Sequence, residues 1–189
     1  MRASGILMPI FSLPSDYGIG TMGKAAYEFI DFLKASGQKY WQLLPIGPTS
    51  YGDSPYQSFS SFAGNPYFID LKELIRQGLL TAEECDEALA SASESSLINY
   101  GLQYTKRLPL LKMAYQRSRH KDTEEFKAFA EHNSYWLKDY ALFMAAKDSF
   151  DGQPLSVWEE DLAMHRTEAV EAWAEKLKDD IGFYEYLQY

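Results

Sequence analysis

The sequence has little cysteine, few histidines and no long apolar run. The one cysteine, Cys85, cannot form an internal disulfide, and no second thiol or histidine lies near it to complete a metal site. The histidines His120, His132 and His165 are scattered at spacings that match no metal motif. No stretch approaches the roughly 18 apolar residues that a membrane span needs. We therefore expect a structural cysteine, no bound metal and no membrane partner.

Positive charge is also scarce, with 18 Lys and Arg against 27 Asp and Glu, a net charge of -9. This balance repels phosphate backbones and anionic lipid, so it argues against nucleic-acid and membrane partners and favours a neutral ligand. The first ten residues carry one positive charge and a short apolar run that Pro9 interrupts, which is unlike a secretory signal. The expected location is the cytoplasm.

Tyrosine, by contrast, is plentiful, with 14 copies in 189 residues. Its side chain combines an apolar ring with a polar tip, which suits sugars as well as mixed packing surfaces. The length allows one ordinary domain but falls below the roughly 250 residues typical of a closed eightfold α/β barrel.

The first 45 residues have the pattern strand, helix, strand. Residues 5–11 form a continuous apolar run, as in a strand covered on both faces. From Gly23 to Gly37 apolar side chains recur every three or four residues, which is typical of an amphipathic helix. Residues 39–45 return to strand composition. Units of this kind build parallel sheets, so we predict an α/β fold with two adjacent parallel strands.

Beyond Asp70, which is placed to cap a helix, the sequence is helical in character. Because two parallel strands are not stable alone, we expect further strands beyond this sequence. For the open strand edges we expect either self-association or partial disorder. The predicted helices cover residues 71–78, 82–92, 102–117, 124–150 and 168–189.

The segment Gly18-Ile-Gly20-Thr-Met-Gly23 matches the dinucleotide-binding pattern. However, the six residues 12–17 separate it from the strand, and the acid expected about 20 residues further on, at the end of the second strand, is absent. We therefore expect no nucleotide and no other cofactor, and assign the glycines to a tight loop and a close helix approach.

The loop of residues 48–66 interleaves tyrosines, hydroxyls, an acid and amides just after the second strand. Ligand sites lie at this end of the strands in α/β barrels. A sugar needs a flat ring against its C–H face and directional partners for its hydroxyls. Composition alone leaves open that this is a rigid loop whose tyrosines pack on helices. Most other carboxylates lie in charged runs typical of solvated faces and are poor catalytic candidates.

With this loop, the sequence resembles the 4-α-glucanotransferases, or amylomaltases, in matching segments that keep the family order over nearly the whole chain. These segments are Gly5-Ile-Leu-Met-Pro-Ile-Phe-Ser-Leu-Pro14, Tyr17-Gly-Ile-Gly20, Tyr40-Trp-Gln-Leu-Leu-Pro-Ile-Gly-Pro-Thr49, Tyr51-Gly-Asp-Ser-Pro-Tyr-Gln-Ser-Phe59, Ala63-Gly-Asn-Pro66, Tyr100-Gly-Leu102 and Trp136-Leu-Lys-Asp-Tyr-Ala-Leu-Phe143.

The resemblance implies the N-terminal part of a (β/α)8 barrel with a large helical insertion. Residues 1–70 would open the barrel and carry the glucan-binding loop, and residues 71–189 would be a mostly helical insertion subdomain, truncated at its end. It also implies retaining transfer of an α-1,4-glucan segment to an acceptor sugar through an aspartate nucleophile, a glutamate acid/base and a second aspartate. The motifs of these three have no counterpart here, so we assign no catalytic residue and expect this chain alone to be inactive.

The resemblance carries over four binding residues for maltooligosaccharides or α-1,4-glucan. Ser54 and Tyr56 resemble residues of the donor subsites near the cleavage point, and Tyr51 and Tyr104 resemble an aromatic pair at a secondary glucan site. Asp53 also matches, but it suits a role in tying its own loop through backbone hydrogen bonds equally well. A non-catalytic glucan-binding or interaction module is the alternative.

Overall fold

The computed structural model describes residues 2–50, 52–93 and 97–189. These form two compact units, Met1–Ser118 and Arg119–Tyr189, each of which is described by itself. The prediction of a functional division at residue 70 stays a prediction. In the described part of the chain, no helix has both the length and the apolar character needed to span a membrane.

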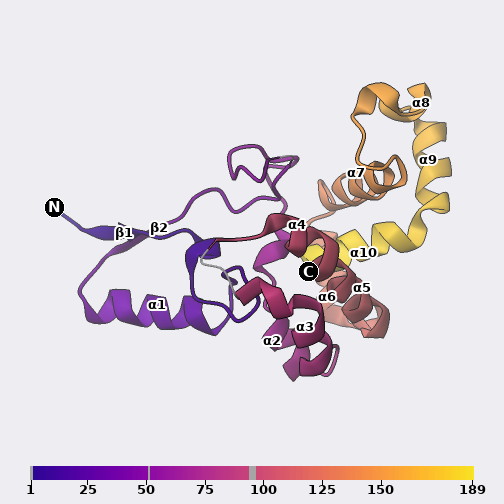
Figure 1. Cartoon of the computed structure of the whole chain (residues 1–189). Helices are drawn as coiled ribbons and strands as arrows, with labels where there is room; N and C mark the ends of the chain where they lie inside the picture. Colours follow the sequence, from indigo (N-terminus) through magenta and orange to yellow (C-terminus); the bar gives the residue numbers. More distant parts are fainter. Residues whose placement is uncertain (1, 51, 94–96) are drawn as a thin grey trace. The chain divides into compact units, whose positions relative to one another are not determined.

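The predicted parallel pair is present in the first unit. Strands β1 (Gly5–Leu7) and β2 (Tyr40–Gln42) pair in parallel, and helix α1 (Lys24–Ala35) makes the crossover between them (Figure 1). The ring of Phe29 on α1 meets the ring of Trp41 on β2 edge-on, with centroids 5.0 Å apart. The apolar stripe of α1 therefore covers one face of the pair, as its periodicity predicts.

Both strands are shorter and less covered than the sequence predicts. Pro9 has no N–H to continue the ladder, and the chain turns into the 3₁₀ helix Ile10–Ser12 directly after it. Leu7 and Tyr40 are 52% and 66% exposed. The expectation of strands covered on both faces is therefore wrong for this chain, because no second layer packs against them among the described residues.

The glycine-rich loop before α1 is explained by close packing. Gly18 has φ +76°, and a Cβ on Gly20 would collide with the carbonyl oxygen of Ile10. Gly23 precedes the first turn of α1 and lies against the side chain of Asp70, which would also collide with a Cβ. The interpretation of these glycines as a tight loop with a close helix approach is supported.

Helical segments make up the rest of the first unit. Asp70 caps α2 as predicted, since its carboxylate accepts a hydrogen bond of 3.2 Å from the N–H of Lys72. The predicted helix over residues 102–117 contains a π-helical stretch, because Pro109 lacks the N–H that a regular turn needs at that point. The segments are Pro66–Phe68 (3₁₀), α2 (Leu71–Arg76), α3 (Ala82–Leu89), Ala90–Ser93 (3₁₀), α4 (Tyr100–Leu102), Gln103–Arg107 (π) and α5 (Leu108–Arg117).

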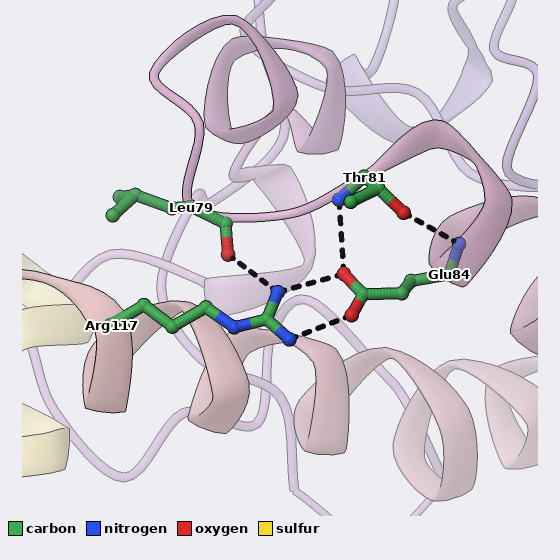
Figure 2. A network of polar contacts seen from close by, with 4 residues as sticks. All are labelled: Leu79, Thr81, Glu84 and Arg117. Atoms are coloured by element: carbon green, nitrogen blue, oxygen red, sulfur yellow. Dashed lines mark hydrogen bonds and ion pairs between the residues drawn. The ribbon is translucent and has the colours of Figure 1, made fainter.

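Helices α3 and α5 are joined by a polar network (Figure 2). Thr81 and Glu84 form a capping box at the start of α3, in which each side chain accepts a hydrogen bond from the other residue's N–H. Arg117 at the end of α5 donates to the Glu84 carboxylate and to the carbonyl oxygen of Leu79. One glutamate thus stabilises a helix start and the contact between two helices.

The second unit is helical throughout, but two of its predicted helices are each divided. Asn133 ends the first, because its amide donates to the carbonyl oxygen of Phe129 (2.8 Å) and accepts from the indole N–H of Trp136 (3.0 Å). Leu177 separates the last two helices. The elements are His120–Asp122 (3₁₀), α6 (Glu124–His132), α7 (Leu137–Ser149), Leu155–Val157 (3₁₀), α8 (Glu160–Ala163), α9 (Thr167–Lys176) and α10 (Lys178–Gln188).

Candidate functional site

Contacts between the two ends of the loop that follows β2 close it, as in a hairpin. Thr49 and Ser58 form an antiparallel bridge, and the N–H of Ser50 donates to the carbonyl oxygen of Gln57 at 3.1 Å. These contacts hold the two ends of the segment together. The residues between them are therefore presented beyond the carboxyl end of a parallel strand.

Within this loop, Ser54 and Tyr56 belong to one tight turn. The N–H of Gln57 donates to the carbonyl oxygen of Ser54 at 3.1 Å, and Pro55 occupies the second turn position, where its fixed φ is favourable. The hydroxyl oxygen of Ser54 also accepts a 3.4 Å hydrogen bond from the N–H of Tyr56. The turn leaves the Tyr56 side chain 71% exposed, so its ring and hydroxyl are free to meet a ligand.

Asp53 precedes this turn in a left-handed conformation, with φ +54° next to Gly52 at φ +90°. Its side chain is half-buried, and burial raises the pKa of its carboxyl group. The carboxylate accepts no hydrogen bond from the described residues of the loop. The N–H of Asp53 donates a hydrogen bond of 3.0 Å to the carbonyl oxygen of Ser50, so Asp53 does tie its own loop through the backbone, although not through its carboxylate.

Tyr67 and Tyr100, from segments that follow the loop, lie near Asp53, and Tyr104 lies near Tyr67. Tyr67 lies in the 3₁₀ helix Pro66–Phe68 and Tyr100 at the start of α4, with their ring centroids 6.2 Å apart. Burial, followed by the charge of Asp53 and the nearby phenols of Tyr104 and Tyr100, raises the pKa of Tyr67 to about 12. Tyr104 itself is 58% exposed. The three rings and the carboxylate form one cluster, which we call the tyrosine cluster (Tyr67, Tyr100, Tyr104 and Asp53).

A buried arginine connects the segments that carry this cluster. Arg107 has no exposed surface, and it donates hydrogen bonds to the carbonyl oxygen of Ile69 (2.5 Å) and to the side-chain oxygen of Gln103 (3.4 Å). Burial lowers its pKa to about 10, which still leaves the guanidinium charged at neutral pH. The arginine thus connects the segment of Tyr67 to the π-helical turn that carries Tyr104.

A small hollow opens between the loop and the segments behind it. Its lining mixes one carboxylate, hydroxyl and amide groups with apolar side chains, and its volume of about 10 Å³ has room for about one water molecule. The lining residues are Phe11, Ile19, Pro45, Thr49, Asp53, Pro55, Asn65, Phe68 and Tyr100.

The structure thus places the four predicted binding residues in different settings. Ser54 and Tyr56 share a turn, Tyr104 belongs to the tyrosine cluster, and Tyr51 lies outside the described residues. Sequence reasoning missed Tyr67 and Tyr100 as site residues. A signal was present for Tyr100, because it precedes Tyr104 by four residues and such a pair shares one face of a helix.

Comparison with known proteins gives a consistent family. Residues 8–189 match the family model described as 4-alpha-glucanotransferase. The chain is 48% identical to a 4-alpha-glucanotransferase of Clostridium butyricum, over 96% of this chain and 37% of the relative. It is 41% identical to a 4-alpha-glucanotransferase of Thermus thermophilus, over 100% of this chain and 37% of the relative. The chain therefore spans little more than a third of the length of these relatives.

Solved structures agree with the sequence matches. An amylomaltase from Streptococcus agalactiae in complex with acarbose superposes with a TM-score of 0.89 at 38% identity, covering 100% of this chain and 38% of that one. An amylomaltase from Corynebacterium glutamicum superposes with a TM-score of 0.71 at 18% identity, covering 98% of this chain and 26% of that one. The second likeness shows a shared fold alone.

Proposed function

Because this chain belongs to the 4-alpha-glucanotransferase family, we propose that it forms the amino-terminal part of an enzyme that transfers a segment of an α-1,4-glucan to an acceptor sugar. Within that enzyme the chain contributes substrate-binding surface. The observation that carries the proposal is the turn of Ser54 and Tyr56, which exposes an aromatic ring beside hydroxyl and carbonyl groups beyond the carboxyl end of a parallel strand. This is where an α/β barrel binds its substrate.

The proposed reaction is a retaining transglycosylation. Such a reaction requires two carboxyl groups about 5 to 5.5 Å apart on either side of the bond, one as nucleophile and one as acid and base. Asp53 is the only acid in residues 48–66, so the loop does not supply such a pair. The proposal assigns both groups to further strands of a (β/α)8 barrel, of which β1 and β2 are the first.

The proposed roles of the binding residues follow from their exposure. Tyr56 covers the C–H face of a glucose unit next to the cleaved bond, and Ser54 donates a hydroxyl hydrogen bond to it. Tyr104, together with Tyr51, holds a more distant part of the glucan. The exposed edges of β1 and β2 support self-association of this chain in isolation.

The binding of maltoheptaose to this chain, followed by NMR titration, tests the proposal. Tyr56→Ala should weaken binding, whereas Tyr27→Ala, which removes an equally exposed tyrosine on α1, should leave it unchanged. Acarbose, with which the Streptococcus agalactiae amylomaltase was solved, should compete. A chain that binds neither sugar, or one that loses as much affinity through Tyr27 as through Tyr56, contradicts the proposed surface.

A further inference from the structure

The Asp53 carboxylate has an unusual environment for a charged group. It is half-buried, and among the described residues it takes part in no hydrogen bond and no ion pair. A carboxylate offers about four acceptor positions, and removing it from water without partners is unfavourable. The left-handed backbone of Asp53 nevertheless holds it there, so a ligand with hydroxyl donors would supply hydrogen bonds that the described residues do not make.

The groups around Asp53 limit which classes of ligand could bind beside it. No lysine or arginine pairs with Asp53 in the part of the chain that the structure describes. Arg107, beside the cluster, is fully buried and donates to Ile69 and Gln103, so an anionic ligand would meet the like charge of Asp53 without a cation to bind it. A metal ion is also disfavoured, because no group of three or more His, Cys, Asp or Glu side chains gathers anywhere among the described residues. A neutral molecule with several hydroxyl groups is what remains.

Two tyrosines supply the apolar part of the same environment. Asp53 and Tyr100 line one hollow, and the ring of Tyr67 lies 6.2 Å from that of Tyr100, so both phenols lie near the carboxylate. Its charge raises the pKa of both tyrosines, after the larger effect of burial. Both rings are partly exposed. Asp53 and Tyr100 line the same small hollow, so a sugar lying over it would meet an aromatic ring and a carboxylate together.

We propose that Asp53, Tyr67 and Tyr100 form a further sugar-binding site, in which the Asp53 carboxylate accepts hydrogen bonds from the hydroxyls of one glucose unit and the two rings pack against it. This inference rests on the proposed function and adds residues to that surface. Asp53 directly precedes the turn of Ser54 and Tyr56, and the ring of Tyr67 neighbours Tyr104. The site thus links two parts of the surface that the sequence treats as separate subsites.

Asp53→Asn in this chain provides a clean test. Asparagine has nearly the same shape and tolerates the left-handed region well, so the φ of +54° is kept while the charge is lost. We expect about tenfold weaker binding of maltoheptaose, the loss typical of one hydrogen bond to a charged group. The matched control is Asp31→Asn, which removes an exposed carboxylate from α1 and should leave the affinity unchanged.

Variants of Tyr100 test the aromatic part. Tyr100→Ala should weaken maltoheptaose binding several-fold, while Tyr100→Phe keeps the ring and should lose less. Amide spectra of each variant establish that the rest of the chain keeps its fold, and Tyr56→Ala, measured alongside, reports on the proposed function by itself.

The possible outcomes separate the two proposals. If Tyr56→Ala weakens binding while Asp53→Asn and Tyr100→Ala bind like the wild type, the further site is refuted and the proposed function stands. If the wild-type chain does not bind maltoheptaose, both are refuted. If Asp31→Asn loses as much affinity as Asp53→Asn, the effect is one of net charge and the further site is again refuted.

Discussion

Arg117 on α5 binds the carboxylate of Glu84 on α3 through two hydrogen bonds of 2.8 and 2.7 Å, one from each terminal nitrogen (Figure 2). The paired geometry is favourable for an arginine and a carboxylate. These bonds, followed by the bond from the N–H of Thr81, lower the pKa of Glu84 from 4.5 to about 2. Since the folded state favours the ionised carboxylate, the network stabilises the fold above a pH of 4.5, and this contribution is lost as the pH falls towards 2.

Glu84→Gln should therefore lower the melting temperature at neutral pH, and the difference from the wild type should shrink and vanish as the pH approaches 2. Thermal unfolding followed by circular dichroism across this range measures it. Glu83→Gln is the matched control, because Glu83 precedes it on the same helix and is exposed. A difference in melting temperature that stays constant with pH would show that the charge of Glu84 is not what stabilises the network.

Arg107 should be far more important for stability than a surface arginine. Arg107→Met removes the donor for the carbonyl oxygen of Ile69 and for Gln103 and leaves buried acceptors unpaired, which costs about 2 to 3 kcal/mol of unfolding free energy. Arg76→Met, at an arginine whose side chain is 74% exposed, should change it by less than about 0.5 kcal/mol. Urea unfolding of both variants compares them, and equal losses would contradict a structural role for the buried guanidinium.

The sequence predicts the parallel pair and its crossover helix because these depend on local periodicity, which α1 displays clearly. The length of β1 was not predictable from apolar composition alone, since the ladder ends at Pro9 and the following residues turn into a 3₁₀ helix. The break after α6 was missed for a different reason. There the Asn133 side chain bonds to backbone and side-chain groups of its neighbours and ends the helix, and propensity over a long window does not detect this.

The candidate site likewise has one part that the sequence predicts and one part that it does not. The turn of Ser54 and Tyr56 is foreseeable, because Pro55 and the serine favour this turn locally. The meeting of Tyr100 with Tyr67 and Asp53 is a tertiary contact between segments more than 30 residues apart in sequence. Arg107, which joins these segments through its bonds to Ile69 and Gln103, is fully buried, and no hydropathy pattern indicates that interior position.

Glucan binding should weaken in acid if Asp53 binds sugar as a carboxylate. Burial raises the pKa of Asp53, so the group becomes protonated at a higher pH than an ordinary aspartate, and the affinity for maltoheptaose should fall as the pH falls through that raised value. The neighbouring phenols of Tyr67 and Tyr100 have raised pKa values and stay neutral in this range. The fall should be absent in Asp53→Asn, and a variant that shows the same pH profile as the wild type would contradict the assignment.

This chain by itself should show no glucan transfer. The proposed reaction needs paired carboxylates on either side of the glycosidic bond, and its binding loop offers Asp53 alone. Incubation with maltotriose, followed by chromatography of the products, should give no redistribution of chain lengths. The appearance of glucose and longer maltodextrins above a blank would show that the chain contains catalytic groups that we have not identified.

Tyr56 should contribute to binding mainly through its ring. A tyrosine can bury roughly 150 to 250 Å², and if a sugar covers about a third of that surface, ~25 cal/mol/Å² gives on the order of 1 to 2 kcal/mol. This corresponds to about tenfold in affinity. Tyr56→Phe should lose less than Tyr56→Ala, because the ring survives and only the hydroxyl contact is removed.

Tyr104 provides the contrast that makes this assignment testable. If Tyr104 holds a distant part of a long glucan, as proposed together with Tyr51, Tyr104→Ala should weaken binding of maltoheptaose and leave binding of maltotriose nearly unchanged. Tyr56→Ala should weaken both, since even a short sugar must occupy the subsite next to the cleaved bond. Titrations of the two variants with both sugars decide between these roles, and equal losses on maltotriose would mean that Tyr56 and Tyr104 contact the same glucose unit.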